Sequence, residues 1–331
     1  MLLSKNFVVF LVFLQFSIIS YATYYYIINT QIKIRLPSHA SLLETEGVSY
    51  LPRQDTENIF LIWFGENYPL VYFKCLETLV FHHPKADVLI FSNELDENLV
   101  EPFWKKGYQN VRVVRFNLTI LGRDKPGFDF VIKATKLLRN ETLDSLIVTS
   151  VHLSDFLRYL LVYTYGGFYI DSDSFVIRNF LKLKNSISVS DNFSYRCTKK
   201  VYNSPNAKNF TCLTNCFFHF DRHHAFMRDA LEMYDVYWTR YQGYGPGGAG
   251  MLINLIEKSF DKINFVSNIE VVCARYISIT ASNYKMDDPK VQKALKTCYT
   301  LQILGGGRST LNFTNFDKSF MGQVYSKSKI F

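Results

Sequence analysis

The sequence lacks the long runs of basic residues that nucleic-acid-binding proteins present. Its 37 Lys and Arg residues outnumber 29 Asp and Glu residues, for a formal charge of +8, yet the basic runs are no longer than pairs such as Lys105–Lys106 and Lys199–Lys200. No nucleic-acid motif accompanies them. We therefore expect no nucleic-acid partner, and the modest positive charge suits an anionic small substrate.

A C-x-x-C pair is also absent, which disfavours a zinc site. The only close spacing, C-x-x-x-C at Cys212 and Cys216, has no second pair nearby. An even number of cysteines fits a protein of the secretory pathway with disulfides, although spacing does not fix the pairing. The other interpretation is buried free thiols, and we expect Cys75, inside an amphipathic helical pattern, to be unpaired. The six cysteines are Cys75, Cys197, Cys212, Cys216, Cys273 and Cys298.

Charged side chains are missing from Phe7–Ile28, a segment that as a helix would be long enough to cross a bilayer. The shorter apolar run Phe7–Ile19, followed by small residues, also fits a cleaved signal peptide. We favour an uncleaved anchor, because apolar and aromatic residues continue to Ile28 with tyrosines placed like an interfacial belt. Residues 1–6 are then a cytoplasmic tail, 7–28 a transmembrane signal-anchor, and 29–57 a polar stem.

The side of the membrane on which the body lies is better indicated by sequons than by flanking charge. Lys5 on one flank and Lys33 and Arg35 on the other orient the segment poorly. N-x-S/T triplets without proline are glycan acceptors when a chain is translocated, so they favour a lumenal body. Five such triplets begin at Asn117, Asn140, Asn192, Asn209 and Asn312.

From Asn58 onward, apolar strand patterns alternate with helical ones, and we expect one catalytic domain over residues 58–331. Ile59–Phe64 is typical of a buried strand, and Tyr72–His82 of a helix ended by proline. Val88–Phe91 and Val111–Phe116 are two further strands. This order predicts an α/β fold with a mostly parallel central sheet flanked by helices, and ligands beyond the carboxyl ends of its strands.

Between Ser154 and Asp173 a helix, a glycine stop, a short strand and two carboxylates follow one another. Ser154 is the expected N-cap, and Phe168–Ile170 the strand. Asp171 and Asp173 stand two residues apart, so in an extended chain both point to one face. Paired carboxylates are oxygen ligands for Mg²⁺ or Mn²⁺, ions that neutralise a diphosphate. A D-x-D alone is also typical of a solvated turn.

This block resembles the sugar-binding D-x-D region of the α-1,4-glycosyltransferases, the family that includes globotriaosylceramide synthase and α-1,4-N-acetylglucosaminyltransferase. The resemblance implies a GT-A type fold, a UDP-sugar donor, a glycolipid or glycoprotein glycan as acceptor, Mn²⁺ (or Mg²⁺) as cofactor and a retained α linkage. It also implies a single-pass type II protein of the Golgi membrane with its catalytic domain in the lumen. The residues that carry it are Ser154, Asp155, Arg158, Gly166, Gly167, Tyr169, Asp171 and Asp173.

The same resemblance assigns roles. It implies that Asp173 binds the metal directly, that Asp171 contacts the ribose or a metal-bound water, and that Asn215 contacts the sugar. Asp155 and Arg158 would line the donor site, since a guanidinium suits phosphate and a carboxylate suits sugar hydroxyls. The alternatives are an i,i+3 ion pair on the helix for Asp155 and Arg158, and a turn residue for Asn215. No side chain is assigned as a catalytic base.

The chain departs from the family's pattern near its C-terminal end. Where the family has A-x-H-x-W, this chain has Tyr299–Leu304, with Gln302 at the histidine position. An amide oxygen ligates a hard cation more weakly, so Gln302 is a candidate third ligand whose presence puts activity in question. Two functions therefore stay open: an active hexosyl- or N-acetylhexosaminyltransferase, and an inactive nucleotide-sugar-binding partner or chaperone of another lumenal transferase. A metal-dependent phosphohydrolase is disfavoured, because Asp287–Asp288 is the one further acid cluster.

Overall fold

The computed structural model describes residues 43, 45–139, 148–189, 213–240, 248–259, 264–270, 272–273, 287, 289, 292, 295–296, 298–302 and 320–331. The chain divides into two units, Met1–Lys33 and Ile34–Phe331, and every described residue belongs to the second. The expected tail, anchor and most of the stem lie outside the described residues, as do all the sequons except Asn117. Within the part of the chain that the structure describes, no helix is both long and apolar enough to span a membrane.

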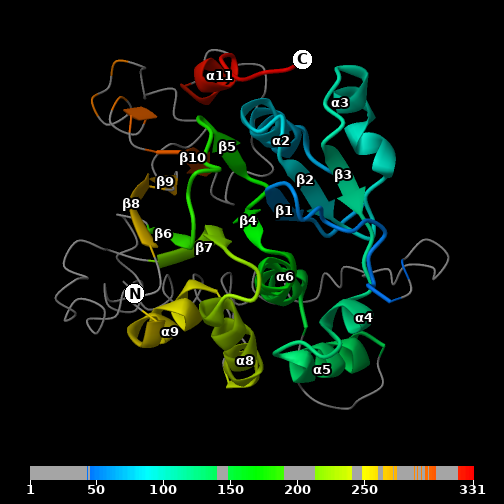
Figure 1. The fold of residues 1–331 in the computed structure, drawn as a ribbon. Coiled ribbons are helices and arrows are strands. Elements are labelled where there is room, and N and C mark those ends of the chain that lie inside the picture. Colours follow the sequence, from blue (N-terminus) through cyan, green and yellow to red (C-terminus); the bar gives the residue numbers. More distant parts are fainter. Residues whose placement is uncertain are drawn as a thin grey trace, which may run out of the picture. The chain divides into compact units, whose positions relative to one another are not determined.

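The centre of the fold is a seven-stranded sheet in the order β3-β2-β1-β4-β7-β6-β8 (Figure 1). Its first half is parallel, as the strand and helix order predicts. However, β7 runs antiparallel to both of its neighbours, β4 and β6, and β8 pairs parallel with β6. The sheet is therefore mixed, because β7 runs against the other strands, which all share one direction as a mostly parallel sheet requires. The strands are β1 (Asn58–Ile62), β2 (Asp87–Phe91), β3 (Val111–Val114), β4 (Gly167–Ile170), β6 (Ser186–Val189), β7 (Leu213–Phe220) and β8 (Asn264–Glu270).

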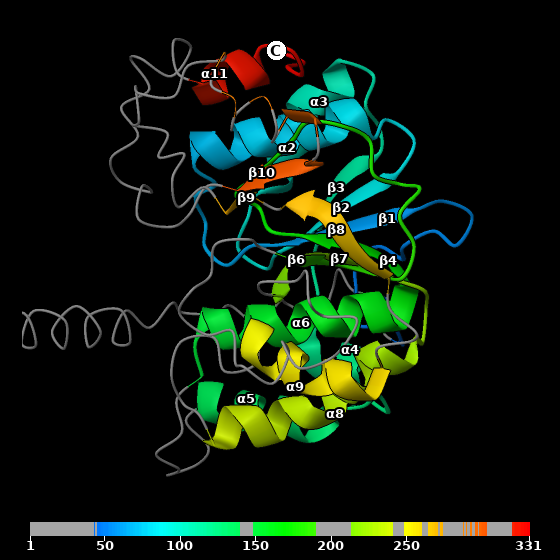
Figure 2. The ribbon, with the colours of Figure 1, turned by 90° about the vertical axis from the view of Figure 1, so that its left-hand side faces the viewer.

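Helices cover both faces of this sheet (Figure 2). On one face lie α4 (Leu118–Gly122), α5 (Phe128–Leu138), α6 (Ser150–Tyr165), α8 (Ala225–Arg240) and α9 (Ala249–Ser259). On the other lie α2 (Leu70–His82), α3 (Glu101–Lys105) and α11 (Phe320–Tyr325), and η2 (Glu97–Val100) leads directly into α3. Each face buries its own apolar cluster, with α6 and α8 contributing to one and α2 to the other, so the sheet is the shared wall of two cores.

A second, small sheet extends from the carboxyl end of β4. It has the order β5-β10-β9, in which β10 (Thr300–Gln302) pairs antiparallel with β5 (Ser174–Val176) and parallel with β9 (Val272–Cys273). The register places Gln302 opposite Ser174. This pairing brings the C-terminal third of the chain to the end of β4.

The N-cap of α6 lies five residues before Ser154, the N-cap that the sequence suggests. Thr149 is the N-cap, and its hydroxyl accepts the backbone N–H of His152 in a capping box. Ser154 therefore lies inside the helix, because the reciprocal contact between the Thr149 N–H and the His152 ring satisfies the first turn further upstream. The helix ends as expected at Gly166, whose φ is +72°.

The folded region begins before Asn58, within the segment expected to be stem. Val48 is fully buried and forms a bridge with Phe116 beyond β3, and Arg53 donates two hydrogen bonds to the Asp87 carboxylate at 2.7 and 2.8 Å. Apolar burial and a paired charge hold this segment on the sheet. Cys75 on α2 is a buried free thiol, as the sequence predicts.

Candidate active site

The D-x-D pair lies in a turn directly after β4. The Asp171 N–H donates to the Cys216 carbonyl on β7 at 2.8 Å, and the Ser174 N–H donates to the Asp171 carbonyl at 3.2 Å. The expected extended chain across Asp171 and Asp173 is therefore replaced by a turn, because the backbone leaves the central sheet here to form β5. The two carboxylates still converge, since Gln302 Nε2 lies 3.1 Å from Asp171 Oδ2 and 3.1 Å from Asp173 Oδ1.

Gln302 reaches this turn through the small sheet. It is the last residue of β10, and the antiparallel register with β5 sets it beside the two aspartates, although 129 residues separate it from Asp173. The residue is buried, with 6% of its surface exposed. Carboxylates only accept hydrogen bonds, so the amide nitrogen is the end that faces them.

Arg158, in the middle of α6, connects several parts of the site. Its Nε donates to the Ser154 carbonyl at 3.3 Å, Nη1 to the Asn215 carbonyl at 2.8 Å and Nη2 to the Ser154 hydroxyl at 3.1 Å. Asp155 and Asp171 each place a carboxylate oxygen 3.3 Å from the guanidinium. The i,i+3 ion pair with Asp155 is thus present as one contact of a larger network, and its arginine side chain is only 9% exposed.

Asp155 and Asn215 form a second polar pair next to Arg158. Asn215 Nδ2 donates to Asp155 Oδ1 at 2.8 Å and to the Tyr159 hydroxyl at 3.3 Å. Burial raises the pKa of Asp155, while the positive charge of Arg158 acts in the opposite direction. Asn215 therefore lies on β7 as part of a buried network and not in a turn.

Tyr169 is a site residue to which the sequence pattern assigns no role. Its hydroxyl donates to Asp171 Oδ1 at 2.6 Å, and the Arg158 guanidinium lies 4.5 Å from its ring centroid. Burial raises the pKa of Tyr169 well above the ordinary value, so the hydroxyl keeps its proton as a donor. The sequence feature that could have identified Tyr169 is its position in β4, two residues before Asp171. Alternate residues of a strand lie on the same face, so Tyr169 is expected on the face of Asp171.

Three aromatic rings adjoin the D-x-D turn. The Trp63 ring centroid lies 4.9 Å from that of Tyr68 and 5.0 Å from that of Tyr72. Burial raises the pKa of Tyr68, and the charge of Asp173 acts in the same direction, so Tyr68 lies near the D-x-D turn. Trp63 directly follows β1, Tyr68 lies in the next loop and Tyr72 on α2, and together they form an aromatic cluster beside the turn.

The donor set at the turn fits a hard cation. Among the described residues, no three His, Cys, Asp or Glu side chains gather as a metal site would require. Asp171 and Asp173 nevertheless each direct one carboxylate oxygen at the same position, which the Gln302 amide nitrogen occupies. Mg²⁺ and Mn²⁺ prefer carboxylate and amide oxygens, so these two carboxylates, and the Gln302 amide when it presents its oxygen, suit such an ion.

Residues 71–194 match the family described as glycosyltransferase sugar-binding region containing DXD motif. The matched stretch includes Asp155, Arg158, Asp171 and Asp173, whereas Asn215 and Gln302 lie beyond it. This part of the chain is therefore similar in sequence to the sugar-binding region of D-x-D glycosyltransferases. An uncharacterized protein of Arabidopsis thaliana is 27% identical over 135 residues, which are 40% of this chain and 20% of that protein. The chain thus spans about a fifth of that relative's length.

Several solved glycosyltransferase structures show a weak likeness. For a chain described as the PaToxG glycosyltransferase the TM-score is 0.43 at 16% identity, covering 62% of this chain and 70% of that one. For the galactosyltransferase LgtC the TM-score is 0.44 at 11% identity, covering 82% and 96%. For the bifunctional glycosyltransferase WbbM it is 0.47 at 13% identity, covering 84% and 53%. None of these likenesses assigns a substrate to this chain.

Proposed function

We propose that the chain is a retaining α-glycosyltransferase that moves a hexose or N-acetylhexosamine from a UDP-sugar to a glycolipid or glycoprotein glycan, with Mn²⁺ or Mg²⁺ as cofactor. The observation that carries this proposal is the convergence of Asp171 and Asp173 on one point, inside the stretch that matches a D-x-D sugar-binding region. Asp171, Asp173 and Gln302 would hold the cation. When bound, a divalent cation stabilises the negative charge of the leaving diphosphate.

The role of Asp171 is divided between its two oxygens. Oδ1 accepts the Tyr169 hydroxyl at 2.6 Å and lies 3.3 Å from Arg158, whereas Oδ2 faces Gln302. Tyr169 and Arg158 therefore fix the carboxylate so that one oxygen stays directed at the point shared with Asp173. In many metal sites, hydrogen bonds from neighbouring groups orient the side chains that bind the metal and thereby affect metal affinity.

Groups around the two aspartates would bind the sugar and the uracil of the UDP-sugar donor. Asp155 and Asn215 are paired in a buried position where a carboxylate and an amide can bind sugar hydroxyls. The partly exposed rings of Trp63 and Tyr68, backed by the buried ring of Tyr72, offer apolar faces for a nucleobase to stack on. We place the uracil at these rings and the sugar toward Asp155.

The location belongs to the same proposal. We infer a type II protein of the Golgi membrane, anchored by residues 7–28, with the domain in the lumen. The support is the charge-free apolar segment and the sequons. Asn117, the one sequon within the described residues, lies partly exposed at the start of α4.

The second candidate, an inactive nucleotide-sugar-binding partner or chaperone of another transferase, is favoured by one observation. Gln302 presents an uncharged amide to the two aspartates, where the resembled family has a histidine. A chain of this kind would bind UDP-sugar but neither hydrolyse nor transfer it.

A donor and acceptor screen tests these proposals. The full-length chain is incubated with UDP-galactose, UDP-N-acetylgalactosamine or UDP-N-acetylglucosamine, with Mn²⁺ or Mg²⁺ and with lactose-terminated acceptors, and products are identified by mass. If the chain is a transferase, we expect a product with one of the donors. This product should be lost in Asp173→Asn but should still form in Asp129→Asn, which changes an exposed acid on α5. Donor binding without hydrolysis or product would favour the inactive partner, and absence of donor binding would refute both.

A further inference from the structure

The short strand β5 follows Asp173 directly, so the position of β5 sets the position of the D-x-D turn. β5 consists of the three residues Ser174–Val176, and β10 pairs with one of its edges, which places Gln302 opposite Ser174. In the small sheet β5 is the outermost strand, and among the described residues no further strand pairs with its other edge. Two paired strands alone are only marginally stable, so contacts at the other edge matter for the site.

Thr78 on α2 makes such a contact. The Ile177 N–H donates to the Tyr299 carbonyl, on the side of β10, so the N–H of the preceding residue, Val176, points away from β10. This N–H donates to Thr78 Oγ1 at 2.9 Å. Thr78 is fully buried, with 0% of its surface exposed. A side-chain hydroxyl of α2 therefore takes the place that a neighbouring strand would have.

The Thr78 hydroxyl lies at a fixed place near the D-x-D turn. Thr78 Oγ1 donates to the Cys75 carbonyl at 2.8 Å, three residues earlier in the helix, and this bond fixes the rotamer of the β-branched side chain. Since a hydroxyl has one hydrogen, Oγ1 faces Val176 as an acceptor. Burial raises the pKa of the Cys75 thiol, and the charge of Asp173 acts in the same direction, so this part of α2 lies near Asp173.

The neighbouring residue, Glu77, holds a second segment against β5. Its carboxylate is buried and accepts the Tyr325 hydroxyl and the Phe331 N–H, the latter at 2.6 Å. The ring of Tyr325 on α11 lies 6.4 Å from that of Phe175, the middle residue of β5. Helix α2 therefore holds β5 directly through Thr78 and indirectly through α11.

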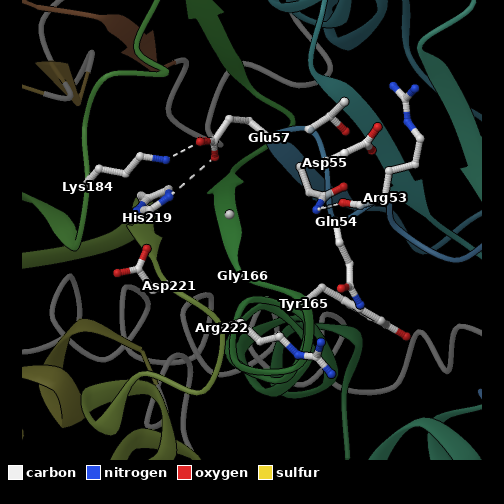
Figure 3. Close-up of a pocket in the computed structure, with 13 residues that line it drawn as sticks. Arg53, Gln54, Asp55, Glu57, Tyr165, Gly166, Lys184, His219, Asp221 and Arg222 are labelled. Carbon is white, nitrogen blue, oxygen red and sulfur yellow. Dashed lines mark hydrogen bonds and ion pairs between the residues drawn. The ribbon is translucent and has the colours of Figure 1, made fainter.

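Different groups hold the opposite end of the central sheet. Gly167, the first residue of β4, lines a hollow in which Glu57 forms an ion pair with Lys184 and lies 3.7 Å from His219 Nε2 (Figure 3). Glu57 precedes β1, Lys184 precedes β6 and His219 belongs to β7. The D-x-D turn follows the other end of β4. A change at Glu57 therefore alters the sheet at the end away from this turn.

We propose that Thr78 is a positioning residue of the D-x-D site. Without its hydroxyl, the buried Val176 N–H lacks its acceptor, which is costly, so β5 moves or opens until another group accepts it. Because Asp173 precedes β5 and Gln302 lies opposite Ser174, this movement changes the spacing of two candidate ligands. Ligands of a site must be held to within about 0.5 Å. This role rests on the proposed function, to which the cation belongs.

Thr78→Val and Thr78→Ser, compared in the full-length chain, test the proposal. Valine removes the hydroxyl at nearly constant volume, whereas serine keeps it. For Thr78→Val we expect hydrogen–deuterium exchange about tenfold faster in peptides covering residues 171–177 and 298–302. Calorimetry in the presence of UDP should show a Mn²⁺ affinity about tenfold lower. Thr78→Ser should stay within about twofold of the wild type in both measurements.

Glu57→Gln is the matched control, because it removes the ion pair at the opposite end of the sheet. It should change neither the exchange of these peptides nor the Mn²⁺ affinity. All variants are compared at a temperature at which circular dichroism shows them folded. Thr78→Ala, which also lacks the hydroxyl, takes the place of Thr78→Val if the valine variant does not fold.

The proposal is overturned if Thr78→Val leaves exchange at β5 and β10 unchanged, or if exchange rises while the Mn²⁺ affinity does not fall. It is also overturned if Thr78→Ser binds Mn²⁺ as weakly as Thr78→Val, since the hydroxyl would then not be responsible, or if Glu57→Gln weakens binding equally. A wild type that binds neither Mn²⁺ nor UDP would refute the proposed function instead. Exchange at β5 and β10 would then decide alone whether Thr78 holds the turn.

Discussion

Asp173 is a carboxylate of the proposed donor site that faces Gln302 across the D-x-D turn. Asn has nearly the shape of Asp, so exchanging the two removes the negative charge and changes the packing little. Asp173→Asn should therefore leave folding nearly intact and lower turnover more than about a hundredfold, equivalent to about 2.7 kcal/mol of barrier. Turnover and Tm are measured side by side with Asp129→Asn as the control. A folded variant with near wild-type turnover contradicts the proposed role.

Gln302 is the residue at which the active and inactive proposals differ most. An amide is a weaker ligand for Mn²⁺ than an imidazole, so Gln302→His should tighten Mn²⁺ binding. Because the affinity of a histidine ligand also depends on groups that orient its ring, we expect a gain of about tenfold, or about 1.4 kcal/mol, from the substitution alone. Calorimetric titration of Mn²⁺ in the presence of UDP measures it for both proteins. Equal affinities, with tight binding by the wild type, would place the third ligand elsewhere in the chain.

At the scale of single elements, the sequence predicted best what local pattern determines. The predicted boundaries of β1, β2, β3 and α2 all lie within two residues of the observed ones. Burial of these elements produces a local sequence pattern, namely apolar runs or alternation in strands and a 3.6-residue spacing in helices. The N-cap of α6 was predicted five residues late, at Ser154 instead of Thr149. The Thr149 capping box with His152 replaces the usual acid partner by an imidazole, which is not a common sequence signal for a helix start.

The start of β4 depends on a glycine for a reason that can be tested. Gly167 has φ +116°, and an added Cβ would lie 2.4 Å from the Asn58 carbonyl oxygen of the paired strand. Gly167→Ala should lower the free energy of unfolding by about 3 kcal/mol or more, because strain and collision add. Gly107→Ala is the control for strain alone, since Gly107 has φ +90° with nothing within 4 Å, and it should cost about 1 kcal/mol. Equal costs in urea unfolding would show that the strand relaxes around the new methyl group.

At the scale of the whole molecule, the site is assembled from segments that no local pattern connects. The β7 strand that carries Asn215 runs antiparallel to β4, and strand direction depends on where the chain re-enters the sheet. The meeting of Gln302 with the aspartates depends on the pairing of β10 with β5. Only the family resemblance suggested Gln302, whereas periodicity and spacing did not. The D-x-D carboxylates were identifiable from sequence because they follow a short apolar strand, but their turn geometry was not.

The stability of the whole domain should depend on two neutral histidines that hold distant segments together. The His83 ring lies at the end of α2, within 2.9 Å of the Leu79 carbonyl oxygen through Nδ1, and its Nε2 accepts the Phe180 N–H at 3.2 Å. Burial lowers the pKa of His83 to about 4, and burial also lowers that of His219 to about 4. His219 accepts the Asn185 N–H at 3.0 Å. Protonation of either ring would break the hydrogen bond in which it is the acceptor.

Because both pKa values are lower in the folded state than the ordinary value of about 6.5, the unfolded chain binds more protons in between, and acid destabilises the fold. The stabilisation is complete above pH 6.5 and is lost progressively down to pH 4. For His83 the loss between pH 7.5 and pH 5 should be about 2 kcal/mol. Urea unfolding of wild type and His83→Gln at both pH values measures it, and carboxylates that also titrate cancel in the comparison. The variant is less stable at neutral pH but should lose about 2 kcal/mol less on acidification. An identical pH dependence in the two proteins would mean that His83 is already charged, or exposed to solvent, in the native state.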